Sequence, residues 1–182
     1  VITNDFYFSS NDYINNKGLV SNYDLLLKNS NSYANNSSNF EENSKYNLFG
    51  KIKIDTSFPM RKKTENYINL LKPLASFRYS PNGNNDLSSK DILLNYDSVF
   101  NLNRIGTTYE VEGGESLSLG LEFKKQDINK NNIFDFRLAN VLRLDENIYL
   151  PKKSRLNNKR SDIVGDINYN LSSNLKMGYF FS

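Results

Sequence analysis

The chain has 182 residues, with 23 Lys and Arg against 20 Asp and Glu, no Cys and no His, and a formal net charge of +3 at pH 7. The length fits a single domain. The lack of Cys and His removes the usual zinc, iron–sulfur and haem ligands and the usual Ser/His and Cys/His nucleophile pairs. No apolar run approaches the roughly 20 residues of a membrane-spanning helix, and the scattered charge forms no basic stripe that would bind nucleic acid. We therefore predict no enzymatic activity, no cofactor or metal, and no nucleic-acid partner.

Apolar residues recur at every second position through most of the chain, which is the period of a β-strand with one apolar and one polar face. Ile52, Ile54 and Phe58 show this alternation, with polar residues between them. In chain order, strands are predicted over 2–8, 19–28, 50–58, 67–79, 116–124, 134–144, 162–171 and 175–181. Several of them reach the length of about 9 to 11 residues that a tilted strand needs to cross a bilayer, whereas soluble strands average about five or six.

Short and long connections alternate between these strands. The long connections lie near 29–45, 80–115 and 145–160. Outer-membrane barrels have this arrangement, with tight turns on the periplasmic side and longer loops outside. The predicted fold class is therefore all-β, an antiparallel transmembrane β-barrel wall of about eight long strands. A soluble carbohydrate-binding β-sandwich is one alternative.

Short motifs spread over 66–182 together resemble the LptD family of outer-membrane lipopolysaccharide-assembly proteins. They comprise an Asn-Arg pair with a nearby Gly, an acidic-Gly turn at 112–114, a strand carrying Gly-Leu, and a strand opening that contains Ser-Asp. The residues of the motifs, apart from the turn, are Asn103, Arg104, Gly106, Gly120, Ser161, Asp162 and Gly165. The resemblance implies a translocon: a large barrel, plugged by a lipoprotein of the LptE type, that inserts lipopolysaccharide into the outer leaflet of the outer membrane without making or breaking a bond.

The resemblance also implies where this chain lies in such a protein. The family's N-terminal periplasmic domain and its last barrel strands have no counterpart in the sequence, so residues 1–182 are expected to be a partial outer-membrane β-barrel domain. Its implied partners are lipopolysaccharide, the plug lipoprotein, outer-membrane lipid and, through the missing N-terminal domain, a periplasmic bridge protein. The alternative is a complete eight-stranded barrel, an anchor or adhesin, which would need its first and last strands to pair.

In a barrel, the polar face of each strand looks into the lumen. Charged side chains there could contact the plug or the passing lipid, or simply line a solvated wall. The candidate lumen residues are Lys51, Lys53, Asp55, Arg78, Glu122, Arg137, Arg143, Asp162 and Asp166. Arg in place of Ile54 or Leu119 is expected to impair barrel assembly, whereas Lys53→Ser is not.

Basic residues gather in the connection at 145–160, which is predicted to lie outside the cell, where lipopolysaccharide phosphates would suit Arg and Lys. A generic polar loop is the alternative. The basic residues are Lys152, Lys153, Arg155, Lys159 and Arg160. In the connection at 80–115, Asn103, Arg104 and Gly106 are expected either to form structural hydrogen bonds or to contact a ligand.

Three glutamates lie around a predicted Gly-Gly turn. Glu110, Glu112 and Glu115 could in principle do glycosidase work or bind calcium. The cluster lacks the spaced Asp/Asn ligands of a calcium loop, so we assign it no catalytic or metal-binding role. Gly113 and Gly114 are expected to supply a positive φ at the turn into the next strand.

Overall fold

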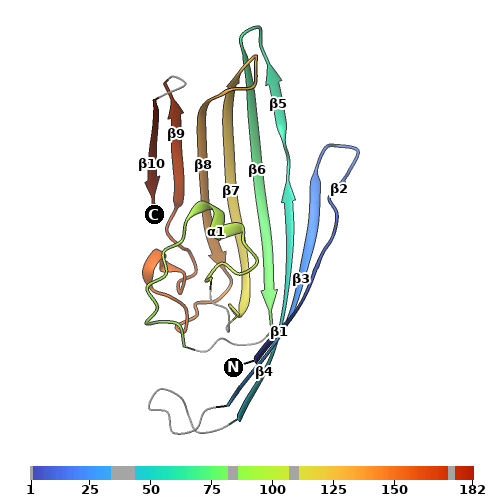
Figure 1. Cartoon of the computed structure of the whole chain (residues 1–182), viewed down its shortest axis with the longest axis vertical. Helices are drawn as coiled ribbons and strands as arrows, with labels where there is room; N and C mark the ends of the chain where they lie inside the picture. The colour runs from blue at the N-terminus through green and yellow to red at the C-terminus, as the bar shows by residue number, and fades with distance from the viewer. Residues whose placement is uncertain (1, 34–43, 82–85, 107–110, 172–174) are drawn as a thin grey trace.

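The computed structural model describes residues 2–33, 44–81, 86–106, 111–171 and 175–182, and here the chain forms a single antiparallel sheet (Figure 1). Eight strands follow one another in the order β1-β3-β4-β6-β7-β8-β9-β10, while the short β2 and β5 pair with β3 and β6. The strands are β1 (Ile2–Ser9), β2 (Tyr13–Ile14), β3 (Val20–Tyr33), β4 (Ser44–Ser57), β5 (Met60–Lys63), β6 (Tyr67–Ser80), β7 (Gly114–Asp127), β8 (Asn132–Arg143), β9 (Val164–Asn170) and β10 (Lys176–Phe181). The predicted all-β antiparallel class is confirmed.

β4 and β5 are two pieces of one long hairpin arm that pairs with β6. The predicted short connection here is therefore in part a strand, interrupted at Pro59, which has no N–H to donate to a ladder. Pro73 of β6 lies opposite this break, and its carbonyl accepts a hydrogen bond from Phe58 N at 3.0 Å. The N and C=O of a strand residue point to the same side, so the missing N–H of Pro73 falls where the neighbouring strand is already broken. This explains how a proline lies inside a long, central strand.

The loop predicted at 29–45 was too long. β3 continues to Tyr33 and β4 begins at Ser44, with Asn29 paired to Leu48 and Asn31 to Tyr46. Asn is depleted in strands on average, but a partner strand that supplies the ladder hydrogen bonds overrides this weak preference. Abundant Asn was therefore a poor marker of where the strands end.

The two ends of the sheet differ in the length of the connections between strands (Figure 1). The short-turn end carries the described tight turns at 15–18, 64–66 and 128–131. The connections from β6 to β7 and from β8 to β9 leave from the opposite, long-loop end. They contain the helix α1 (Tyr96–Phe100) and the 3-10 helix η1 (Lys153–Arg155). In the part of the chain that the structure describes, no helix is long and apolar enough to cross a membrane.

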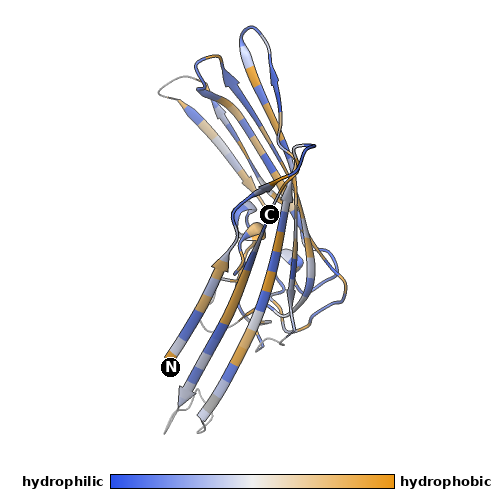
Figure 2. Cartoon of the chain, turned by 90° about the vertical axis from the view of Figure 1, so that its right-hand side faces the viewer, coloured by the Kyte–Doolittle hydropathy of each residue, from blue (hydrophilic) through white to orange (hydrophobic). Residues whose placement is uncertain are grey.

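In a soluble protein the apolar face of a sheet is buried and the polar face is exposed, and in this sheet the exposures of the two faces are reversed. On one face, called the outer face below, Ile54, Phe77 and Leu119 are 41%, 40% and 40% exposed. On the opposite, inner face, Arg78 and Ser118 are only 2% and 1% exposed. Figure 2 shows this alternation as bands along the strands. A soluble β-sandwich would bury the apolar face against a second sheet, so that alternative does not fit the structure.

The inner face is covered by two segments of the long connections, the first loop (86–106 and 111–113) and the second loop (144–163). Both loops contribute to one hydrophobic core that also includes three wall residues from β8 and β9. Its buried members are Leu87, Leu94, Tyr96, Val99, Ile105, Ala139, Val141, Leu150, Leu156 and Val164. The main core of the chain therefore lies between loops and wall, on the polar side of the sheet.

β1 and β10 form the two edges of the sheet. Each pairs with one neighbour in the described part of the chain, and they do not pair with each other. This sheet therefore lacks the pairing that a closed eight-stranded barrel would need.

Candidate functional site

The polar side chains of the inner face form cross-strand rows, because directly opposed residues of an antiparallel sheet lie on the same face. One row runs across β3, β4, β6, β7 and β8 close to the long-loop end. Its members are Asp24, Lys53, Arg78, Ser116 and Arg143. These residues come from five separate strands, so only the register of the sheet brings them together.

Wall cations hold the C-terminal end of α1. The last carbonyls of a helix lack partners within it and carry partial negative charge, and α1 has no basic residue in its last turn. The wall supplies the missing donors from β4 and β6. The bonds are Lys51 Nζ to Leu102 O at 3.0 Å, Lys53 Nζ to Phe100 O at 3.0 Å, and Arg78 Nη2 to Val99 O at 3.4 Å and to Asn101 O.

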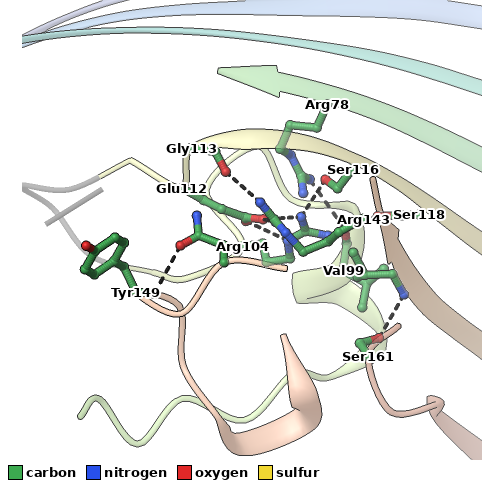
Figure 3. A network of polar contacts seen from close by, with 12 residues as sticks. Arg78, Val99, Arg104, Glu112, Gly113, Ser116, Ser118, Arg143, Tyr149 and Ser161 are labelled. Atoms are coloured by element: carbon green, nitrogen blue, oxygen red, sulfur yellow. Dashed lines mark hydrogen bonds and ion pairs between the residues drawn. The ribbon is translucent and has the colours of Figure 1, made fainter. Parts of the chain in front are cut away.

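Glu112 of the first loop is buried among arginines (Figure 3). Its carboxylate accepts from Arg104 Nε at 2.7 Å and pairs with Arg143 of β8. Arg104 also donates to Ser116 Oγ at 2.7 Å, and Arg143 to Gly113 O at 2.7 Å. Burial alone would raise the pKa of Glu112, but the neighbouring guanidinium groups outweigh it and hold the pKa well below its ordinary value. Glu112 therefore joins the first loop to β8 as a charged group.

A second row, toward the short-turn end, alternates in charge across β6, β7, β8 and β9. It reads Lys72, Glu122, Arg137 and Asp166, with Lys72 Nζ 3.5 Å from Glu122 and Arg137 Nη2 2.8 Å from Asp166. The start of α1 is bound to this row. The contacts from α1 are Tyr96 OH to Glu122 at 2.8 Å, Asp97 to Arg137 Nη1 at 2.7 Å, and the Tyr96 ring under Arg137 at 4.7 Å. The two rows together fix both ends of α1.

Gly120 lies on the wall between the two rows, and its lack of a side chain leaves room for Phe100 of α1. A Cβ atom at this position would lie 2.5 Å from Phe100 Cζ and 2.6 Å from Leu74 Cδ1. Such distances are far inside van der Waals contact, so any side chain at position 120 would displace Phe100. The Gly of the Gly-Leu motif thus has a packing role.

The second loop binds the first loop and the wall. Backbone N–H groups of the first loop donate to it: Leu94 N to Ser154 Oγ and Leu87 N to Tyr149 O, at 2.9 and 2.8 Å. Ser161 Oγ accepts from Val141 N of β8 at 2.9 Å. The two loops therefore dock as one unit.

The structure places the candidate lumen residues in three environments. The loops cover Lys51, Lys53, Arg78 and Arg143. The alternating row contains Glu122, Arg137 and Asp166. Asp55 is partly exposed and pairs with Lys53 at 2.8 Å. Asp162 is not on the wall, because β9 begins at Val164; it pairs with Arg155 at 3.3 Å within the second loop.

Lys53 has three partners, so its replacement is not the neutral control that the sequence suggested. Besides Phe100 O, its Nζ contacts Asp24 at 3.0 Å and Asp55 at 2.8 Å. Removal of the Lys53 ammonium group would leave two neighbouring carboxylates and a helix carbonyl without this partner. We therefore expect Lys53→Ser to destabilise the docked first loop.

The basic residues of the second loop point away from the core. Lys152, Lys153, Arg155, Lys159 and Arg160 are all exposed, while Ser154 and Leu156 between them are buried. Lys153 pairs with Asp91, and Arg155 with Asp162. The loop thus combines a fixed backbone with a cationic surface.

The remaining motif residues have mainly structural surroundings. Gly106 and Gly114 adopt positive φ of 67° and 86°, as expected at position 114. A Cβ at Gly165 would collide with Arg137 O, so this glycine allows β9 to approach β8. Of the three glutamates, Glu110 lies outside the described residues, and the described residues contain no group of three metal-ligating side chains.

Two cavities open on the inner face. One, of about 490 Å³, lies between α1 and the strands β3, β4 and β6, and the other, of about 600 Å³, lies nearer the short-turn end. Charged inner-face residues that line the second cavity are Arg61, Lys72, Glu122, Lys124, Asp135 and Arg137. The loops thus fill the half of the inner face near the long-loop end and leave a polar, charged surface in the other half.

Comparison with protein families gives one result that covers nearly the whole chain. The family LptD, LPS transport system D, matches residues 2–180. No curated protein matches the sequence. The family match confirms the resemblance of the motifs and extends it to 2–65, where the sequence motifs gave no specific signal.

Proposed function

Since the chain belongs to the LptD family of lipopolysaccharide transport proteins, we propose that it forms part of the wall of the outer-membrane translocon that inserts lipopolysaccharide into the outer leaflet. The family is one of transport proteins, so the proposed role is non-enzymatic. The observation that carries the proposal is the inverted sheet, which exposes its apolar face while the loops cover half of its charged face. Such a sheet suits a wall with lipid on one side and a polar interior on the other.

The dimensions of the apolar face support a membrane location. On β6 the outer-face residues are apolar or aromatic from Leu71 to Tyr79. This stretch spans about 27 Å along the strand at about 3.4 Å per residue, or about 20 Å across a bilayer at a tilt of roughly 40°. The apolar band of outer-membrane barrels is about 25 Å tall, so the apolar stretch of β6 covers most of that height.

The unpaired edges support a role within a larger barrel. β1 and β10 would each require a further strand partner for every backbone N–H and C=O to be satisfied in lipid. We propose that these partners belong to the rest of a larger barrel, of which this chain is a partial domain. The periplasmic bridge protein would then bind elsewhere in the full-length protein.

The uncovered half of the inner face is the proposed place for the polar partners. Its cavities carry both cations and carboxylates, with side chains such as Lys72 and Lys124 about two-fifths exposed, at 41% and 43%. Both charge signs suit a protein surface, such as that of a plug lipoprotein of the LptE type, and the cations suit lipopolysaccharide phosphates. The docked loops would close the other half of the lumen to direct passage.

Controlled depletion of the full-length protein tests the proposal. Cells that make the protein from a repressible promoter should lose newly made lipopolysaccharide from their surface, measured by labelling intact cells with a reagent that does not cross the outer membrane. Expression of the wild-type protein should restore the label. Unchanged surface lipopolysaccharide during depletion would overturn the proposed function.

A further inference from the structure

A cationic row crosses the outer face near the short-turn end. Lys62 of β5 lies directly opposite Asn69 of β6, and Asn69 lies directly opposite Lys125 of β7. Directly opposed residues share a face, so all three side chains leave the outer face. With strands about 4.8 Å apart, the Cα atoms of the two lysines are about 10 Å apart, with an amide between them.

The next row toward the long-loop end is apolar. It consists of Met60, Leu71, Phe123, Phe136 and Ile167, paired in register across five strands. The cationic row therefore stands at the border of the apolar band, where a lipid changes from acyl chain to head group. At the opposite border of the apolar band, Tyr79 of β6 is paired with Glu115 of β7, and this pair carries no cation.

Aromatic rings flank the cationic row. The Lys125 ammonium group lies 4.1 Å from the centroid of the Tyr67 ring, and Lys125 is paired with Phe134 on β8. An ammonium group over an aromatic face is oriented by the ring quadrupole. This contact holds Lys125 beside Asn69 and leaves its remaining donors for a ligand.

We propose that Lys62, Asn69 and Lys125 bind the phosphate of an anionic phospholipid in the leaflet at the short-turn end, with its acyl chains along Leu71 and Phe123. The inference rests on the proposed function, because it requires the outer face to meet lipid. Two ammonium groups and an amide N–H are donors to phosphate oxygens, and charge-assisted bonds of this kind are the strong ones. A zwitterionic head group carries its own ammonium group, which two nearby lysines repel.

Native mass spectrometry of the purified full-length protein tests the site. The protein in detergent is mixed with equal amounts of phosphatidylglycerol and phosphatidylethanolamine, and the bound lipids are counted. The wild type should retain phosphatidylglycerol in several-fold preference, and the double variant Lys62→Gln/Lys125→Gln should lose that preference. Lys62→Arg/Lys125→Arg should keep it. Lys152→Gln/Lys159→Gln, which removes the same charge from the second loop, should also keep it.

The outcomes separate this inference from the proposed function. An unchanged preference in the Lys62→Gln/Lys125→Gln variant would overturn the site, even though both lipids still bind. Loss of the preference in the Lys152→Gln/Lys159→Gln control would also overturn it, because net charge alone would then explain the effect. Retention of neither lipid by the wild type would overturn the proposed membrane wall itself. Heat-dependent migration on a gel confirms that each variant is folded.

Discussion

Glu112 is a buried charged residue that joins the first loop to the wall. It is 2% exposed and lies between Arg104 of its own loop and Arg143 of the wall. A buried ion pair adds little compared with a well-packed apolar pair, but removal of one partner leaves an uncompensated charge in a poorly solvated place. Loss of Glu112 should therefore cost far more than the pair itself contributes.

Glu112→Gln should lower the free energy of unfolding of the folded protein in detergent by about 3 to 5 kcal/mol, because Arg104 and Arg143 then remain buried without a counter-charge. The midpoint of a denaturation curve measures this. Glu115→Gln, three residues along, is the control, because no ion pair of Glu115 is found in the described part of the chain. Equal midpoints for the two variants would contradict the account.

The same carboxylate gives a pH dependence with a defined sign. The pKa of Glu112 in the folded protein is lowered from the ordinary value of 4.5, so the folded state holds the carboxylate more strongly than the unfolded state does. Its stabilising contribution is complete above about pH 4.5 and is lost as the pH falls toward the lower folded pKa. The protection factors of the amide hydrogens in the two loops, which correct for the pH dependence of intrinsic exchange, should therefore fall on acidification in the wild type. The fall should be smaller in Glu112→Gln, and identical acid dependence would refute this.

At the residue scale, the sequence indicated which side chains share a face but not what they bind. The alternation put Lys53, Arg78 and Arg143 on one face because neighbours two apart along a strand point the same way. Lys53 and Arg78 donate to carbonyls at the end of α1, and Arg143 donates to Glu112 and Gly113 O. These contacts depend on strand register and on a loop that folds back, which no local pattern encodes. Arg104 and Glu112 were noticed as a motif and a cluster, yet their pairing is a tertiary contact.

At the scale of the element, α1 and the two loops form one unit whose fit to the wall depends on Gly120. Phe100 packs where a side chain at position 120 would stand. α1 has only five residues, too few to be stable alone. Its capping box at Asn95 and Ser98 and the wall cations at its other end together supply the missing stability.

Gly120→Ala should destabilise the docked first loop by about 1 to 3 kcal/mol, because the new methyl group overlaps Phe100. Limited proteolysis within the first loop should become faster. Addition of Phe100→Ala should remove much of this extra effect, since the overlapping ring is then absent. Gly50→Ala is the control, because its nearest contact would be an ordinary 3.7 Å; if Gly50→Ala and Gly120→Ala have equal effects, the packing role is wrong.

The strands could be predicted from the sequence far better than the loops. A period of two over 10 or more residues is a strong signal, and β6, β7 and β8 lie close to their predicted ranges. The Asn-rich ends of β3 and β4 were missed because composition argued for a turn. The core beneath the loops could not be predicted from a local pattern, because their apolar residues, such as Leu94 and Val99, show no strand or long-helix period and find their partners only in the assembled core.

At the scale of the whole molecule, the chain is a wall with opposite chemistry on its two sides. Leu119→Arg places a charge near the middle of the apolar face and should cost about 2 to 4 kcal/mol of assembly free energy. Lys124→Ser, on the inner face of the same strand, removes a side chain that is 43% exposed and should cost much less. The yield of folded full-length protein in the outer membrane measures both, and equal losses would contradict the assigned faces.

A spin-label scan along β7 tests the central claim most directly, since the chain has no cysteine and each label site is unique within it. Single cysteines at 119, 121, 122, 123 and 124 of the full-length protein are labelled and measured in lipid bilayers. Labels at Leu119, Leu121 and Phe123 should be accessible to oxygen, which concentrates in lipid. Labels at Glu122 and Lys124 should instead be accessible to a water-soluble paramagnetic complex. The account predicts this strict alternation, and uniform access of the water-soluble complex to all five positions would contradict it.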